Sequence, residues 1–169
     1  MIHIYCGDGK GKTTAAMGLA LRMAGFGGQV VIGQFFKDGS SSEIGPLRGI
    51  PGITVEHCAT VPGRYALLTP EQRVQAAKDY TAYLHRLLEQ AEGKSLLILD
   101  EAVSACNYGT IPEQEVADFL KTHGDKMEIV LTGRNPSDRL AQLADYVTEM
   151  VKRKHPFDSG TPARPGIEF

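Results

Sequence analysis

The sequence predicts a three-layer α/β/α sandwich on a mostly parallel sheet of about six strands. Apolar runs of strand length alternate along the chain with segments of helical periodicity, which is typical of β-α-β units. Two of these runs, 95–99 and 127–131, lack polar alternation, so we expect both faces of these strands to be buried in a parallel sheet. A glycine-rich segment, 7–11, joins the first strand directly to the first helix.

Six segments have the length and composition of strands. The first begins at the second residue, so no signal peptide is expected, and no apolar run reaches the roughly 20 residues that a membrane span needs. The length of 169 residues fits one domain, 1–169, and we expect it in the cytoplasm. The expected strands are 2–6, 29–34, 53–57, 95–99, 127–131 and 146–151.

Helix starts are marked by their capping residues. The first helix is expected at 12–24, after the glycines. The stretch Thr69-Pro70-Glu71-Gln72 offers a Thr cap, a proline at the first helical position and a glutamine three residues after the cap. The stretch Thr110-Ile111-Pro112-Glu113 predicts a helix by the same logic, and 135–138 begins a short helix. A tail, 153–169, follows the last strand and is expected to lie over the functional site.

Composition disfavours several classes of protein. The formal net charge of -2 argues against a general nucleic-acid binder, because such domains carry a basic excess. Three cysteines without C-x-x-C spacing disfavour both a disulfide framework and a structural zinc site. With 42% hydrophobic residues, the chain has enough apolar material for a sizeable core.

The segment between the first strand and the first helix has the composition of a phosphate-binding loop. Glycines let consecutive N–H groups converge on one point, and the helix N-terminus adds free N–H groups and a positive dipole end. We expect Lys12 to reach the terminal phosphates of Mg-ATP and the Thr13 hydroxyl to bind magnesium. Cys6 stands where the full Walker pattern has glycine, so the loop is one residue short. The loop reads Gly7-Asp8-Gly9-Lys10-Gly11-Lys12-Thr13-Thr14, which makes the expected fold a P-loop NTPase-like, RecA-like one.

Charged residues follow the ends of other strands. Asp100 and Glu101 end a buried run, so we expect them at the carboxyl edge of the sheet, where ligands bind in open α/β folds. One should bind Mg²⁺ directly or through water, and the other should position it or a reacting group. Lys10, Lys37 and Arg134 also follow strand ends and are expected to neutralise the triphosphate. For Lys37 and Arg134 a plain surface position is the alternative.

Motif physics alone leaves several kinds of nucleotide chemistry open. A GTPase would carry an Asn-Lys-x-Asp motif for reading the base, and the sequence has none. A small-molecule kinase usually closes an arginine-rich lid over the transferred phosphate. The loops here hold only isolated arginines, Arg48 and Arg64, which weakens that interpretation. A nucleotide-binding switch without catalysis stays open.

The sequence resembles the corrinoid adenosyltransferase family over nearly its whole length and in the same order. The shortened phosphate loop is itself part of that family's pattern, and the tail has no role in generic P-loop enzymes. The segments that carry the resemblance are 4–16, 34–37, 99–101, 131–134, 147–150, 154–160 and 166–169.

The resemblance implies transfer of the 5′-deoxyadenosyl group of ATP to the cobalt(I) of a corrinoid, with release of triphosphate. It implies that the catalytic residues are Lys12, Thr13 and Glu101, with Lys10 and Thr14 also holding the triphosphate and none acting as a general base. Thr13 and Glu101 would hold Mg²⁺, and Arg134 would add a phosphate contact. A flavin-type reductase would supply the electron, and the family makes a homodimer the expected assembly.

The resemblance also places the corrinoid over the loop after the third strand and over the tail. Residues 59–68 contain Tyr65 as their single aromatic, and Phe157 and His155 lie in the tail. For Tyr65 and Phe157 plain packing is the alternative to corrinoid contact. For His155 a capped or packed side chain is favoured over a cobalt ligand. The small aromatic content near Tyr65 also leaves open a carrier that binds ATP and corrinoid without turnover.

Overall fold

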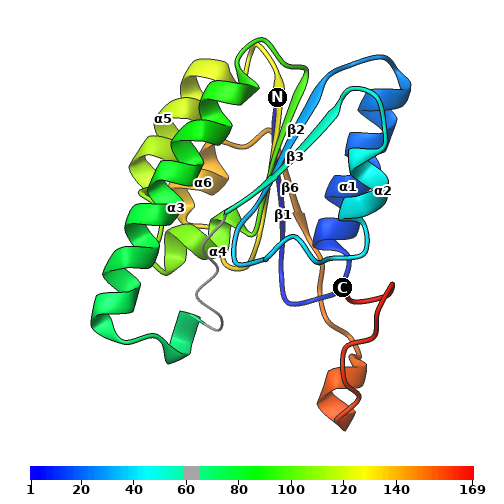
Figure 1. Ribbon diagram of the computed structural model, residues 1–169, viewed down its shortest axis with the longest axis vertical. Coiled ribbons are helices and arrows are strands. Elements are labelled where there is room, and N and C mark those ends of the chain that lie inside the picture. Colours follow the sequence, from blue (N-terminus) through cyan, green and yellow to red (C-terminus); the bar gives the residue numbers. More distant parts are fainter. Residues whose placement is uncertain (59–64) are drawn as a thin grey trace.

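Six parallel strands form one sheet between two layers of helices (Figure 1). The computed structural model describes residues 1–58 and 65–169, apart from the side chain of Ala66. The strand order is β3-β2-β4-β5-β1-β6, and each neighbouring pair is parallel, so the predicted α/β/α class is confirmed. The strands are β1 (Ile2–Cys6), β2 (Val30–Gln34), β3 (Ile53–His57), β4 (Leu96–Asp100), β5 (Glu128–Thr132) and β6 (Tyr146–Glu149).

The helices divide between the two faces of the sheet. Figure 1 shows α1 and α2 on one side, and α3, α4, α5 and α6 on the other. None of the described helices is long and apolar enough to cross a bilayer. The α-helices are α1 (Lys12–Gly25), α2 (Ile44–Arg48), α3 (Pro70–Ala91), α4 (Ala102–Asn107), α5 (Glu113–His123) and α6 (Asp138–Leu143), and short 3₁₀ turns form η1 (Tyr65–Leu67) and η2 (Pro156–Ser159).

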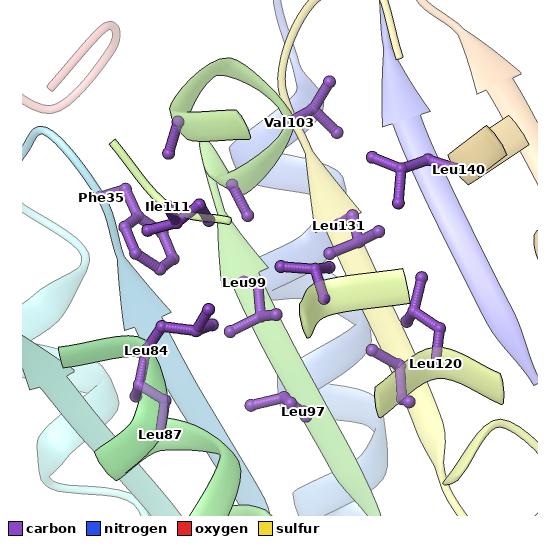
Figure 2. Close-up of a cluster of buried hydrophobic side chains, with 14 of the residues drawn as sticks. Phe35, Leu84, Leu87, Leu97, Leu99, Val103, Ile111, Leu120, Leu131 and Leu140 are labelled. Atoms are coloured by element: carbon purple, nitrogen blue, oxygen red, sulfur yellow. The ribbon is translucent and has the colours of Figure 1, made fainter. Parts of the chain in front are cut away.

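The central strands supply both hydrophobic cores. All five residues of β4 are buried, as the unbroken apolar run predicts. Leu97 and Leu99 pack toward α3 and α5, where they meet residues such as Leu84 (Figure 2). Leu96 and Ile98 point to the opposite core, under α1 and α2. Burying each such side chain contributes about 1.5–3 kcal/mol, so β4 fixes the middle of the sheet.

Two helix starts depend on residues that the sequence singles out, with opposite outcomes. Thr69 caps α3, and its hydroxyl accepts the Gln72 N–H in a complete capping box, as predicted. The expected cap at Thr110 is wrong, because α5 begins at Glu113 with Pro112 in the cap position. Thr110 is instead fully buried, and its hydroxyl donates to the Ala105 carbonyl at 2.8 Å. It closes the end of α4 rather than opening α5.

The last strand is shorter than expected because the chain turns to meet the glycine-rich loop. The expected strand ran to residue 151, whereas β6 ends at Glu149. The Met150 N–H donates to the Cys6 carbonyl at 2.8 Å, and the Met150 carbonyl accepts the Gly9 N–H at 2.6 Å. The end of β6 therefore supports the loop between β1 and α1.

Candidate functional site

A cavity of about 770 Å³ opens at the carboxyl edge of the sheet. It brings together the loop at the N-terminus of α1, the ends of β4 and β5, and the tail. Of the sequence-predicted residues, those lining it are Asp8, Gly9, Lys10, Gly11, Lys12, Thr13, Thr14, Lys37, Glu101, Arg134 and His155, and the tail adds Gly166, Ile167, Glu168 and Phe169.

Glycines in the loop are required by backbone conformation and by close contact. Gly7 and Gly11 have φ values of 102° and 116°, in the left-handed region that favours glycine. A Cβ atom on Gly7 or Gly9 would lie 2.5 Å from the Met150 carbonyl oxygen. The loop therefore holds its shape by packing its bare main chain directly against the end of β6.

We expect Gly9→Ala to weaken ATP binding by at least about tenfold, or 1.4 kcal/mol. The added methyl group would collide with main-chain atoms of Met150, so the loop must shift and its amides lose their alignment. Gly25→Ala is the matched control, because a Cβ at Gly25 meets nothing within 4 Å. Calorimetric titration with Mg-ATP measures both variants. Unchanged affinity in Gly9→Ala would show that the loop tolerates displacement.

Both loop lysines have main-chain carbonyls as partners. The Lys12 ammonium donates to the Gly9 carbonyl at 2.8 Å, within its own loop. Burial lowers the pKa of Lys12, while the carboxylate of Glu101 acts in the opposite direction. The Lys10 ammonium donates to the carbonyl of Ile167 in the tail. Two positive charges thus stand at the cavity, and within residues 1–58 and 65–169 no carboxylate bonds directly to either ammonium.

Asp100 is the centre of a hydrogen-bonded network behind the loop. Its side chain is fully buried, although both acids were expected to emerge at the sheet edge. Its Oδ1 accepts from the hydroxyls of Thr13 at 2.8 Å and Thr132 at 2.7 Å. Its Oδ2 accepts from Lys37 Nζ at 2.7 Å and from Gln34 Nε2 at 3.2 Å. Asp100 therefore orients the Thr13 hydroxyl and holds Lys37 at the cavity wall.

Glu101, unlike Asp100, lies at the cavity, because the chain turns at this residue from β4 into α4. Its φ of 62° is uncommon for a residue with a side chain and costs of order 1 kcal/mol or more. The Thr132 hydroxyl accepts its N–H at 2.8 Å, and the Ser104 hydroxyl donates to its carboxylate at 2.7 Å. Its side chain lines the same cavity as the two lysines.

The residues present fit the predicted magnesium ion. Mg²⁺ prefers oxygen ligands and is usually bound through one or two carboxylates together with substrate phosphates and waters. Thr13 and Glu101 supply a hydroxyl and a carboxylate to the same cavity. The buried Gln34 Oε1 has no donor within the described part of the chain, so it is a ready acceptor beside Asp100. The described residues contain no all-protein cluster of three or more His, Cys, Asp or Glu.

Arg134 reaches the cavity through a tight turn that α4 supports. Gly133, with φ 147°, precedes it, and a Cβ there would lie 2.7 Å from Cβ of Val103. The Asn107 side-chain amide donates to the carbonyls of Arg134 at 2.8 Å and Asn135 at 3.1 Å. Asn107 is a supporting residue that sequence reasoning missed, because its role depends on contact with a distant loop.

We expect Asn107→Ala to raise the KM for ATP by about three- to tenfold while kcat changes little. The substitution removes two hydrogen bonds of roughly 0.5–1.5 kcal/mol each, and at this exposed position water replaces part of them. Steady-state kinetics with varied ATP measure the effect. Gln114→Ala, which removes a surface amide bonded to Asp118, is the control and should leave the KM unchanged. Equal effects in both variants would contradict a role in holding Arg134.

The three residues expected on the corrinoid side are placed differently from one another. His155 caps η2, since its Nδ1 accepts the Phe157 N–H at 3.2 Å, and it also lines the cavity. Phe157 is 74% exposed, so its ring is not packed against the rest of the protein, which was the alternative to corrinoid contact. Tyr65 is half-buried, and its hydroxyl donates to the Tyr108 carbonyl. Residues 59–64 of the same loop, including Arg64, lie outside the described residues.

Comparisons with known proteins identify the family of this chain. The family model described as ATP:corrinoid adenosyltransferase BtuR/CobO/CobP matches residues 1–169. A corrinoid adenosyltransferase of Sinorhizobium sp. is 35% identical over 179 residues, covering all of this chain and 80% of that protein. Those of Escherichia coli K12 and Salmonella typhimurium LT2 are each 30% identical, over 169 and 170 residues, again covering all of this chain and 85% of each protein.

A structural comparison concerns the fold alone. The chain of EssC (ATPases 2 and 3) from Geobacillus thermodenitrificans superposes with a TM-score of 0.53 at 16% identity. That match covers 99% of this chain and 36% of the EssC chain. This likeness agrees with the predicted α/β/α fold class. Together with the full-length match, the relatives establish that this chain belongs to the ATP:corrinoid adenosyltransferase family.

Proposed function

We propose that this protein transfers the 5′-deoxyadenosyl group of ATP to the cobalt(I) of a corrinoid and releases triphosphate, in the biosynthesis or salvage of adenosylcobalamin. Beyond membership of the family, the charged lining of the cavity supports the proposal. One cavity is lined by Lys10, Lys12, Arg134 and Glu101 together with the first residues of α1. This arrangement suits a bound polyphosphate with an associated cation, because positive groups and helix N–H groups converge on one point.

The residues act on the leaving group in the proposed reaction. Cobalt(I) attacks C5′, a Co–C bond forms, the C5′–O bond breaks, and its electron pair departs with the triphosphate. Negative charge therefore grows at the phosphate end in the transition state, and the proposed role of Lys10, Lys12 and Arg134, which line the cavity, is to stabilise it. Cobalt(I) needs no proton removed before it attacks, so none of these side chains has to act as a base.

Thr13 and Glu101 are proposed to hold magnesium, with Asp100 positioning the Thr13 hydroxyl, and Thr14 is proposed as a further hydrogen-bond donor to the phosphates. When bound, Mg²⁺ supplies additional positive charge to the leaving triphosphate. The Thr13 hydroxyl donates a hydrogen bond to the Asp100 carboxylate, with 2.8 Å between the two oxygens. The lone pairs of the Thr13 oxygen therefore point away from Asp100. Lys37, paired with Asp100 at 2.7 Å, also lines the cavity and is proposed as a further contact to the phosphates.

The second substrate and the assembly are also part of the proposal. The corrinoid would approach from the side of Tyr65, His155 and Phe157, and a flavin-type reductase would supply the electron. A homodimer is supported by β6, an edge strand whose four residues are all exposed and whose outer side is open to pairing. We place the protein in the cytoplasm.

The test combines spectroscopy with analysis of the phosphate products. The protein is incubated with Mg-ATP and chemically reduced cobalamin under anaerobic conditions. We expect the visible spectrum of a cobalt–carbon bond to appear together with one equivalent of inorganic triphosphate. Formation of ADP without triphosphate would reject the proposal in favour of a small-molecule kinase. Tight binding of both ligands without product would favour the carrier without turnover.

A further inference from the structure

Four aromatic side chains from separate segments meet beside the nucleotide cavity. We call Phe36, Tyr65, Tyr80 and Tyr108 the aromatic cluster. The ring centroids of Tyr65 and Tyr108 lie 5.0 Å apart, and the Phe36 ring lies 5.9 Å from Tyr65 and 5.8 Å from Tyr108. The ring centroids of Tyr80 and Phe36 lie 5.3 Å apart in a T-shaped arrangement. These distances are those of favourable aromatic pairs, so the cluster is a packed unit.

Phe36 ties this cluster to the nucleotide cavity. Its φ of 57° is a genuine outlier for a bulky residue and costs of order 1–3 kcal/mol. The Phe36 N–H donates to the Tyr80 hydroxyl at 3.1 Å, which holds the turn. The next residue, Lys37, reaches Asp100 at 2.7 Å. The strained turn thus places a ring in the cluster and an ammonium at the cavity from two consecutive residues.

Tyr108 is the outward-facing member of the aromatic cluster. Its side chain is 55% exposed, whereas Tyr80 is fully buried, and burial raises the pKa of Tyr80 to about 12. The Tyr65 hydroxyl donates to the Tyr108 carbonyl at 3.1 Å, which fixes the two residues together. Tyr108 ends the helix that Glu101 begins, so at roughly 1.5 Å per residue the backbones of the two residues lie about 10 Å apart along the axis of α4.

We propose that Tyr108 contacts the corrinoid and that Tyr65 and Phe36 are positioning residues for its ring. The proposal rests on the proposed function, because transfer to cobalt requires the corrinoid to lie within reach of the nucleotide. A broad conjugated macrocycle gains dispersion energy from an aromatic surface held in one orientation. The aromatic cluster provides such a surface. It is joined to the nucleotide cavity through Phe36, which precedes Lys37, and through Tyr108, which ends the helix that Glu101 begins, and both Lys37 and Glu101 line that cavity.

The test separates corrinoid recognition from nucleotide binding. We expect Tyr108→Ala to raise the KM for reduced cobalamin about tenfold, with the KM for ATP unchanged. Tyr108→Phe keeps the ring and should retain the wild-type KM for cobalamin. Phe26→Ala removes an 88% exposed ring at the far end of α1 and should change neither constant. Equilibrium dialysis of cob(II)alamin in the presence of Mg-ATP measures corrinoid affinity without turnover and should show the same order.

Several outcomes would overturn the assignment of Tyr108. An unchanged affinity for cobalamin in Tyr108→Ala, or an equal rise in the KM for ATP, would mean that the ring serves only the packing of α4. Loss of affinity in Tyr108→Phe equal to that in Tyr108→Ala would contradict a role for the ring. Failure of the proposed function is recognised separately: wild-type protein would then form no cobalt–carbon bond, while dialysis would still report on corrinoid binding.

Discussion

Lys12→Ala is expected to lower kcat/KM for ATP by about two to three orders of magnitude. The ammonium lies at the start of α1, within a loop whose shape depends on Gly7, Gly9 and Gly11. Lys10 also lines the cavity, but its ammonium bonds to the tail carbonyl of Ile167, whereas the Lys12 ammonium bonds within the loop itself, to the Gly9 carbonyl. The loss should appear in affinity as well as in rate, since the charge faces the phosphates before and during the reaction.

Isothermal titration with Mg-ATP and the triphosphate-release assay measure the two effects of Lys12→Ala. The matched control is Lys126→Ala, an exposed lysine before β5 at the opposite edge of the sheet. Thermal unfolding should show both variants folded, because the Lys12 ammonium bonds to a carbonyl of its own loop and ties no other element to it. Wild-type affinity in Lys12→Ala would disprove the assignment of this loop to the triphosphate.

Asp100→Ala should be the most damaging change to stability at the site, at about 3 kcal/mol. Removing one partner of a buried ion pair costs about 3–5 kcal/mol, and Lys37 is partly exposed, which places the value at the lower end. The hydroxyls of Thr13 and Thr132 also lose their acceptor. ATP binding should fall with stability, because Thr13 is no longer oriented.

Urea unfolding, followed by circular dichroism, measures the free energy of unfolding of Asp100→Ala. Asp100→Asn keeps the shape and one acceptor oxygen, so we expect a smaller loss of stability together with a clear loss of ATP affinity. Asp125→Ala, at an exposed aspartate on the opposite edge of the sheet, is the control and should stay within about 0.5 kcal/mol of wild type. Wild-type stability in Asp100→Ala would mean that the network carries little energy.

The sequence is most informative where one short segment carries a strong local preference. Every described strand coincides with a predicted strand to within two residues. The signal is strongest for β2 and β4, whose five residues are all buried, because burial on both faces demands unbroken hydrophobicity. The capping box at Thr69 is equally local and is confirmed. The phosphate loop was recognisable because its glycines, lysines and threonine act through consecutive backbone groups.

The parts that could not be predicted depend on tertiary contacts. α2 and α4 have five and six residues, too few for a periodic pattern, and they form by packing rather than by propensity. α4 also requires Glu101 in a left-handed conformation that the sequence does not announce. Burial of Asp100, support of Arg134 by Asn107 and assembly of the aromatic cluster each join residues that are far apart along the chain.

The dependence of the glycine-rich loop on β6 has a consequence for the order of folding. The Gly9 N–H and the Cys6 carbonyl bond to Met150, and the Asp8 carboxylate accepts the Lys152 N–H at 2.9 Å. A ribosome makes the first of these partners about 140 residues before the last, so long-range closure must come late. During synthesis the nascent chain should therefore remain unable to hold nucleotide until β6 has left the ribosomal exit tunnel.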